Sequence, residues 1–200
     1  MDLGDHVKVL NRIYLIMTWR SVNRIVLQIL FSVSILLCAS CERLTLRRGL
    51  SAMYSHSISF QDSVIRIYDK NVTKETLSKR SIPTFIVYID SAECQSCRIS
   101  KLMKYSDLYN DDKGNVNVVV LFSPSKGNLD HLQSVLSRYN YPFPVYIDPN
   151  NTFLKTNPFI PEDRRFRSFL IDREGNVIFV GDPTTSPKLR YLYNRIITNY

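Results

Sequence analysis

Two cysteines separated by two residues, Cys94 and Cys97, are the side chains of this sequence best suited to chemistry. They follow an apolar run at 83–90 that ends in a small polar patch. Such a pair can exchange disulfides, take part in a metal site or form a structural disulfide. Which of the three applies depends on the surrounding residues and on the compartment that the chain reaches.

Metal binding is the chemistry that the rest of the sequence supports least. Structural zinc normally takes four ligands, and neither His56 nor His131 stands at a pairing interval. Covalent haem attachment needs a histidine directly after the second cysteine, where this chain has Arg98. We therefore expect no metal and no cofactor, and we expect His131 to be an exposed or capping residue.

The order of strand, cysteine and helix favours disulfide exchange. A buried strand would deliver Cys94 to the start of a helix, where unpaired N–H groups and the helix dipole stabilise a thiolate. Cys97 lies one turn further on and would attack and release a mixed disulfide. Arg98 and Lys101 add positive charge and Glu93 opposes it, so we expect a moderately lowered pKa for Cys94. The alternative is a permanently oxidised staple, although so short a loop adds little chain-entropy stabilisation.

The first 40 residues have the pattern of an export signal. Arg20 and Arg24 precede a largely apolar run of thirteen residues at 25–37, shorter than the about 20 that cross a bilayer. The run leads into Cys38-Ala39-Ser40-Cys41 and resembles a bacterial lipoprotein signal, in which the last cysteine is lipidated. Cys38 stands where the strict pattern prefers leucine, and an uncleaved signal anchor is the alternative. We expect a signal peptide at 1–40 and lipidation at Cys41.

An exported chain meets oxidising conditions, in which disulfides persist. From Cys41 onward the net charge is +6, with 22 Lys and Arg against 16 Asp and Glu. No basic stripe is interleaved with aromatics, so we expect no nucleic acid; the charge favours contact with an anionic membrane. Arg43, Arg47 and Arg48 differ from the acidic run of surface-exposed lipoproteins in Bacteroidota, which indicates an anchor facing the periplasm of the cell envelope.

The remaining sequence predicts a membrane tether at 41–57 and one domain at 58–200. Alternating apolar and polar residues predict a hairpin of strands at 58–60 and 63–68, followed by a polar connector at 70–80. Longer apolar runs predict five further strands, at 83–90, 115–123, 143–148, 167–172 and 177–181. Helical periodicity predicts helices at 94–109, 128–139 and from Pro187 onward, the first with Ile99, Leu102, Met103 and Leu108 on one face. The order indicates a three-layer α/β fold with a mixed sheet.

Three stretches resemble thioredoxin-fold lipoproteins of Bacteroidota, within a branch that includes TlpA/ResA-type proteins and the AhpC/TSA peroxiredoxins. They are YIDSAECQSCR at 88–98, YPFPVYIDPNN at 141–151 and RRFRSFLIDREGNVIFVGDP at 164–183. The resemblance covers about 58–200. It implies a thioredoxin-like α/β/α sandwich with a mixed central sheet. It also implies thiol–disulfide exchange on a protein or small-molecule substrate.

Several residues depart from the thioredoxin pattern. Glu93 and Gln95-Ser96 replace the aromatic residue and Gly-Pro around the cysteines, and no proline stands at 166–169, where thioredoxins place a cis-proline. Tyr88 occupies the position of the buried acid, and Asp90 is a candidate substitute or a strand-end residue. Because the cis-proline shapes the substrate groove of thioredoxins, the resemblance alone does not imply general disulfide reductase activity.

A peroxiredoxin-like thiol peroxidase is the alternative within the fold. Ser91-x-x-Cys94 fits the end of the peroxiredoxin motif, although Val87 replaces its proline, and Arg165 or Arg167 would hold the peroxide. Ser91 and Arg167 are accordingly candidate supporting residues around Cys94 and Cys97. The alternative of another class is a non-catalytic binding lipoprotein with a structural Cys94–Cys97 disulfide. The sequence does not indicate an oligomeric state.

Overall fold

The computed structural model describes residues 28, 42–60, 63–78, 81–91, 93, 95–111 and 115–200 of the 200-residue chain. Contacts divide the chain into two units, Met1–Arg47 and Arg48–Tyr200. In the first unit, residues 42–47 are helical. Apart from residue 28, the expected signal peptide lies outside the described residues, as does Cys41. Within the described part of the chain, no helix is both long enough and apolar enough to span a bilayer.

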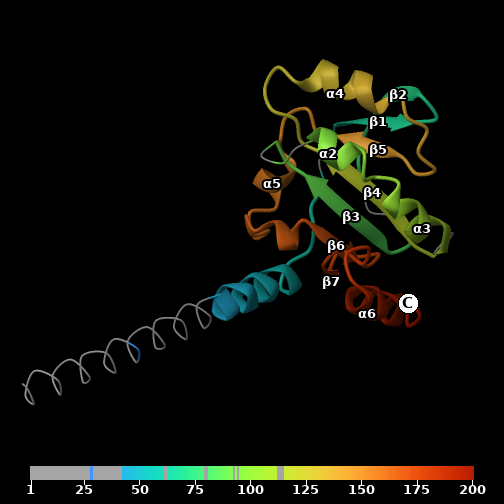
Figure 1. Cartoon of the computed structure of the whole chain (residues 1–200). Helices are drawn as coiled ribbons and strands as arrows, with labels where there is room; N and C mark the ends of the chain where they lie inside the picture. The colour runs from blue at the N-terminus through green and yellow to red at the C-terminus, as the bar shows by residue number, and fades with distance from the viewer. Residues whose placement is uncertain are drawn as a thin grey trace, which may run out of the picture. The chain divides into compact units, whose positions relative to one another are not determined.

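In the described part of the second unit, seven strands form one mixed sheet in the order β2-β1-β5-β4-β3-β6-β7 (Figure 1). β3, β4 and β5 are parallel to one another, and the other pairs are antiparallel. The strands are β1 (Val64–Tyr68), β2 (Asn71–Glu75), β3 (Thr84–Ile89), β4 (Asn117–Phe122), β5 (Val145–Ile147), β6 (Ser168–Ile171) and β7 (Val177–Val180).

Helical segments cover both faces of the sheet. Phe85 of β3 belongs to the main hydrophobic cluster, which includes residues of α2 (Gln95–Ile99), α3 (Lys104–Asp111), α4 (Leu129–Leu136) and α6 (Pro187–Ile197). On the opposite face, the ring of Tyr88 stacks on Phe153 of the short helix α5 (Phe153–Thr156), with ring centroids 5.3 Å apart. The 3₁₀ turn η1 (Arg164–Phe166) leads directly into β6. The expected three-layer α/β fold with a mixed sheet is confirmed.

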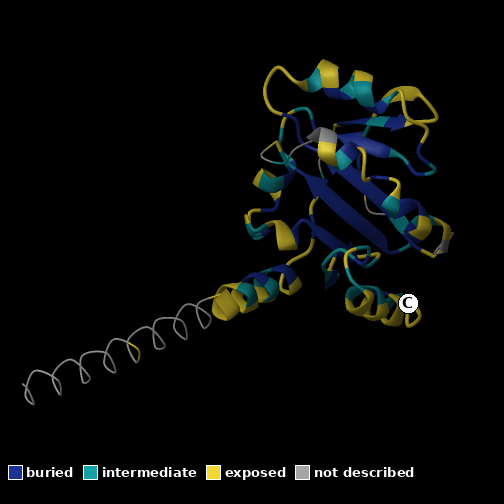
Figure 2. Cartoon of the chain, in the orientation of Figure 1, coloured by how far each residue is buried: buried dark blue, intermediate teal, exposed yellow. Residues whose placement is uncertain are grey.

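The strand that leads to the cysteine motif is at the centre of this arrangement. All six residues of β3 are buried, as Figure 2 shows for the middle of the sheet. The sequence TFIVYI has no polar residue after Thr84, because strands covered on both faces need apolar side chains on both. β4 has the same character, with NVVVLF buried from its second residue onward.

The helix predicted at 94–109 is two helices, α2 and α3, separated by a tighter stretch. Backbone bonds from residues 101, 102, 104, 105 and 106 run to the residue three earlier, as in a 3₁₀ helix. This tightening shifts the helical phase, so Met103, predicted to be buried, is 54% exposed. Ile99, Leu102 and Leu108 are buried as predicted.

The hairpin predicted from 58–60 and 63–68 is wrong. β1 pairs with β2, which lies in the expected polar connector, through a two-residue turn at Asp69 and Lys70 with φ of 48° and 61°. Residues 58–60 are not a strand. The backbone of Ser59 is instead bonded on both sides by the buried Asn157, whose amide accepts from its N–H and donates to its carbonyl, each at 2.8 Å. β2 is an exposed edge of the sheet.

Part of the segment at 41–57, where the sequence predicts a membrane tether, belongs to the second unit. Residues 48–54 are helical and belong to the second unit, and Met53 is fully buried. Gly49 lies against Phe166, so that a Cβ at this position would come within 2.4 Å of the ring. Ser57 forms a β-bridge with Asn176. The compact unit thus begins at Arg48, ten residues before the domain start that the sequence predicts.

We predict that Gly49→Val lowers the free energy of unfolding by about 1–3 kcal/mol, because the added atoms overlap the buried ring of Phe166. Ser51→Val is the matched control, since Ser51 is exposed on the same helix and receives the same side chain. Urea unfolding of the two variants and the wild type measures the difference. Equal midpoints for the two variants would show that the helix at 48–54 does not pack as described.

Candidate functional site

The cysteine motif lies where β3 reaches the surface. After Asp90, the N–H of Glu93 donates to the Asp90 carbonyl at 3.2 Å and closes a turn, and α2 begins at Gln95. Ser91 is exposed in this turn. Cys97 is exposed on α2 and is disulfide-bonded. Cys94 lies outside the described residues, so its pairing with Cys97 stays a prediction.

Glu93 and Arg98 form an ion pair beside the motif. Arg98 Nε lies 3.4 Å from Glu93 Oε2, and the Glu93 side chain is only 7% exposed. The carboxylate next to Cys94 in the sequence therefore has a cation beside it, as its burial requires. This pairing is consistent with the opposition between Glu93 and Arg98 that the sequence suggests.

Arg167, a site residue proposed from the sequence, lies at the same end of β3. The backbone N–H of Tyr88 donates to the Arg167 carbonyl at 2.8 Å, which fixes the start of β6 beside the end of β3. The Arg167 side chain is 6% exposed, with Nη2 3.4 Å from Asp90 Oδ2. Its guanidinium lies over the Tyr88 ring, 5.3 Å from the centroid. Asp90 is thus the ion-pair partner of Arg167 and not solely a strand-end residue.

The guanidinium of Arg167 is incompletely hydrogen-bonded. Nη2 donates to the Glu162 carbonyl at a long 3.4 Å. Nε and Nη1 are buried and have no hydrogen-bond partner among the described residues. Buried donors of this kind are rare and usually have a structural or functional reason. A buried cation with two unused donors is therefore a main electrostatic feature at this end of β3.

Tyr88 contributes a neutral hydroxyl where thioredoxins have an acid. Burial raises the pKa of Tyr88, although a hydrogen bond with Ser123 lowers it in part. The phenol therefore stays protonated at neutral pH. In this position it can donate or accept a hydrogen bond, and it carries no charge that could take a proton from a thiol.

A second polar cluster, around Asp182 in the loop after β7, was not found from the sequence. Lys104 Nζ donates to Asp182 Oδ2 at 2.6 Å and the Tyr105 hydroxyl donates to the same oxygen at 2.9 Å. Thr184 donates to Oδ1 from its hydroxyl at 2.6 Å and its N–H at 2.9 Å. The polar run Asp182-Pro183-Thr184 after a buried strand was the available signal, but its partners lie 77 and 78 residues away.

These contacts determine the ionisation of both acids in the cluster. Burial by itself would raise the pKa of Asp182, but hydrogen bonds from Lys104 and Thr184 outweigh it and the pKa is lowered. Burial and the neighbouring Asp182 charge raise the pKa of Tyr105, which Arg98 lowers in part. Arg98, whose charge lowers the Tyr105 pKa in part, belongs to α2, the helix of the cysteine motif.

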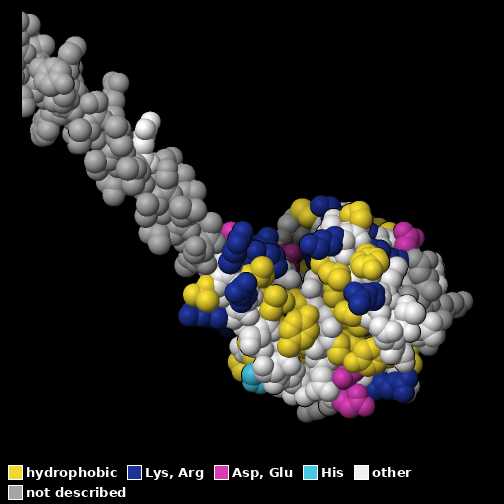
Figure 3. Space-filling view, turned by 90° about the horizontal axis from the view of Figure 1, so that it is seen from below, with side chains coloured by type: hydrophobic (Ala, Val, Ile, Leu, Met, Phe, Trp, Pro, Cys, Tyr) yellow, Lys and Arg dark blue, Asp and Glu magenta, His cyan; other side chains and the backbone are white. Residues whose placement is uncertain are grey.

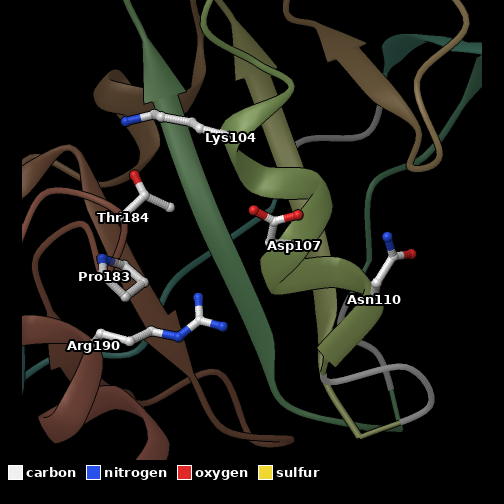
Figure 4. A pocket seen from close by; sticks show the side chains of 6 residues that line it. All are labelled: Lys104, Asp107, Asn110, Pro183, Thr184 and Arg190. Atoms are coloured by element: carbon white, nitrogen blue, oxygen red, sulfur yellow. The ribbon is translucent and has the colours of Figure 1, made fainter. Parts of the chain in front are cut away.

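A cleft of about 700 Å³ adjoins this cluster (Figure 4). Its walls come from α3 and from the loop and first turns that lead into α6. Asp107 and Arg190 extend toward it from opposite sides. The polar lining suits a hydrated or peptide-like group better than an apolar one. The residues that line it are Lys104, Asp107, Asn110, Pro183, Thr184 and Arg190.

In the described part of the chain, no group of three or more His, Cys, Asp or Glu side chains is arranged to hold a metal ion. His131 is exposed on α4, which agrees with the expectation for this residue. The residues that the structure gathers at the end of β3 are Tyr88, Asp90, Glu93, Cys97, Arg98 and Arg167.

No family model and no curated protein matches this chain. Among solved structures it is similar to a candidate thiol:disulfide interchange protein, DsbE, of Chlorobium tepidum, with 17% identity and a TM-score of 0.47 over 72% of this chain and 96% of that one. It is also similar to the exposed lipoprotein thioredoxin of Streptococcus pneumoniae, with 14% identity and a TM-score of 0.48 over 68% of this chain and 99% of that one. A third similar structure is the mitochondrial 2-Cys peroxiredoxin of Plasmodium falciparum, with 15% identity and a TM-score of 0.47 over 72% of this chain and 94% of that one.

We predict that Asp182→Asn lowers stability at pH 7 by about 1–3 kcal/mol, because it leaves Lys104 without its charged partner. The lowered pKa of Asp182 means that its contribution is present above the ordinary value of 3.8 and is lost as pH falls through the folded-state value. Urea unfolding between pH 7 and pH 3 should therefore show a smaller loss on acidification for this variant than for the wild type.

The matched control for that experiment is Asp107→Asn, an identical change at an exposed position of α3. It should leave both the stability at pH 7 and its pH dependence near those of the wild type. A pH profile for Asp182→Asn that parallels the wild type would contradict the role assigned to the Asp182 cluster.

Proposed function

We propose that this protein is a thiol–disulfide oxidoreductase that uses Cys94 and Cys97. The observation that carries the proposal is the state and position of Cys97, which is exposed, disulfide-bonded and on the helix that directly follows the central strand. A purely structural disulfide would gain little from so short a loop and would have no need of this exposed place.

In the reductive direction, the Cys94 thiolate attacks one sulfur of a substrate disulfide, and the other sulfur leaves as a thiol after taking a proton. The Cys97 thiolate then attacks the Cys94 sulfur and releases the second substrate thiol. The substrate gains two electrons and two protons, and Cys94 and Cys97 become a disulfide. A dithiol reductant restores the pair by the reverse exchange, and an oxidising partner would drive the opposite direction.

The surroundings support a thiolate without forcing an extreme pKa. We expect the positive end of α2, and the buried charge of Arg167 at the end of β3 where the motif begins, to favour the ionised thiol. Asp90 lies against Arg167, and Glu93 lies against Arg98, so each cation is opposed by a carboxylate. We infer a catalytic pair with a moderately lowered Cys94 pKa.

The proposed location is the cell envelope, with lipid on Cys41 holding the domain at the periplasmic side of a membrane. The charged residues, the apolar run and the Ala-Ser-Cys that follows it support this proposal from the sequence. The oxidising environment there would maintain the oxidised form in the absence of a reductant. The expected partners are proteins or small molecules that carry thiols or disulfides.

We predict a reduction potential of about −120 to −270 mV for the pair, the range of catalytic dithiols, and a Cys94 pKa below about 8.5. Alkylation trapping in glutathione or dithiothreitol buffers measures the potential, and the pH dependence of alkylation in Cys97→Ser measures the pKa. A potential below about −300 mV, or an alkylation-resistant Cys94, would instead identify a structural disulfide in a binding protein. Cys94→Ser is the control for labelling at the remaining thiol.

A second candidate, a peroxiredoxin-like thiol peroxidase, is favoured by one observation. Nε and Nη1 of Arg167, which have no hydrogen-bond partner among the described residues, could hydrogen-bond the oxygens of a hydroperoxide. Arg165 is a poorer candidate, because it is paired with Asp163 at 2.7 Å and its side chain is 48% exposed.

If the protein is a peroxidase, Arg167→Lys should reduce hydroperoxide consumption by about tenfold or more, because lysine keeps the charge but not the planar set of donors. Arg165→Lys is the matched control and should leave the rate unchanged. The assay follows peroxide loss with dithiothreitol as reductant. Equal rates for both variants, or no peroxide consumption by the wild type, would exclude the peroxidase and leave disulfide exchange as the function to test.

A further inference from the structure

We propose that the outer face of α6 is a docking surface for an anionic membrane. The proposal rests on the export and lipid anchoring of the proposed function, but it does not depend on the cysteine chemistry. It assigns a second, electrostatic contact to a domain whose first contact would be the lipid on Cys41.

The composition of α6 is the first support. Between Ser186 and Tyr200 the sequence has three cations, Lys188, Arg190 and Arg195, and no Asp or Glu. Each such cation adds binding free energy to a helix that lies on an anionic membrane, provided that the cation is within about a Debye length of the lipid headgroups. Lys188 and Arg195 are both exposed.

The burial pattern of α6 is the second support for the proposal. Tyr193 is completely buried and packs edge-on against Phe85 and Phe179, which fixes the inner face of the helix. Tyr191 is 65% exposed and Leu192 is 37% exposed. Tyrosine and leucine beside exposed cations are typical of helices that lie in a membrane interface.

The surface seen from below agrees with this description. α6 lies at the lower end of the domain in Figure 1, and Figure 3 shows the molecule from that side. Hydrophobic side chains gather over the middle of this face with Lys and Arg side chains among them, and Asp and Glu lie mostly toward its margin. Charge complementarity therefore favours an anionic lipid surface over an uncharged apolar protein surface as the partner.

The N-terminal entry to the domain reaches the same edge of the sheet. α6 contacts β7, the hydroxyl of Tyr54 is hydrogen-bonded to the backbone of Val180 in β7, and Ser57 bridges to Asn176 just before that strand. Six residues, 42–47, lie between Cys41 and Arg48, where the second unit begins, and the seven Cα–Cα steps from Cys41 to Arg48 span at most about 25 Å. A lipid on Cys41 would thus keep the β7 edge of the domain near the bilayer.

The first test places a fluorophore on the proposed surface. Residues 48–200 form a compact unit with its own core and contain no tryptophan, since the single tryptophan is Trp19. With Tyr191→Trp in this domain, the emission should shift to the blue on addition of phosphatidylcholine vesicles that contain phosphatidylglycerol. Tyr139→Trp, at a position that is 49% exposed after α4, is the control and should not shift.

The second test reverses the charge. In a vesicle sedimentation assay, Lys188→Glu with Arg195→Glu should weaken binding by about tenfold or more, since each cation near an anionic surface contributes about fivefold. Lys74→Glu with Lys126→Glu makes the same change in net charge on exposed residues of β2 and of the loop before α4, and should bind like the wild type. Raising the salt to about 0.5 M should abolish the difference.

Equal weakening in the two double variants, or equal binding to vesicles of pure phosphatidylcholine, would overturn the proposal. A blue shift that depends on protein concentration without vesicles would mean that the face binds a second copy of the chain, and would overturn it too. A domain with both cysteines changed to serine should bind vesicles unchanged. Failure of the membrane proposal is thereby distinguished from failure of the redox proposal.

Discussion

The structure depends on a central strand that is buried on both faces and yet ends at the surface. β3 has no exposed residue, so helices must cover one face of it and the segments at 48–60 and 153–166 the other. Directly after the strand, Asp90 is partly exposed and forms an ion pair with the buried Arg167, and Ser91 is exposed. The cysteine motif therefore begins where the chain leaves the buried strand and reaches the solvent.

Long apolar runs made the central part of the fold predictable, because a strand buried on both faces can tolerate few polar residues. β3, β4 and the last helix lie where the sequence indicates them. The hairpin was missed because its turn uses Asp69 and Lys70 at positive φ, where Asn-Gly is the usual signal. A strand was wrongly predicted at 58–60. The backbone N–H and carbonyl of Ser59 are hydrogen-bonded by the side-chain amide of Asn157 and not by a neighbouring strand.

The candidate site divides in the same way. Arg167 could be found from the sequence because it directly precedes a recognisable strand, and pairing of that strand with β3 brings it to the motif. Asp182 could not be found from the sequence. Its interactions with Lys104 and Tyr105 come from the packing of α3 over the sheet, and they produce no pattern in the sequence. Its distance along the chain from those partners hid this cluster from the sequence analysis.

The exposed strand β2 has a consequence for the behaviour of the protein at high concentration. It is the terminal strand in the order of the described sheet, and an edge strand is where a strand of another molecule can add, as happens at the start of aggregation. Lys74 and Glu75, at the end of a strand only five residues long, oppose such edge-to-edge growth through charge and through the short length available for pairing. Replacing Lys74 by an uncharged β-branched residue would thus make the folded domain more prone to form fibres without altering its core.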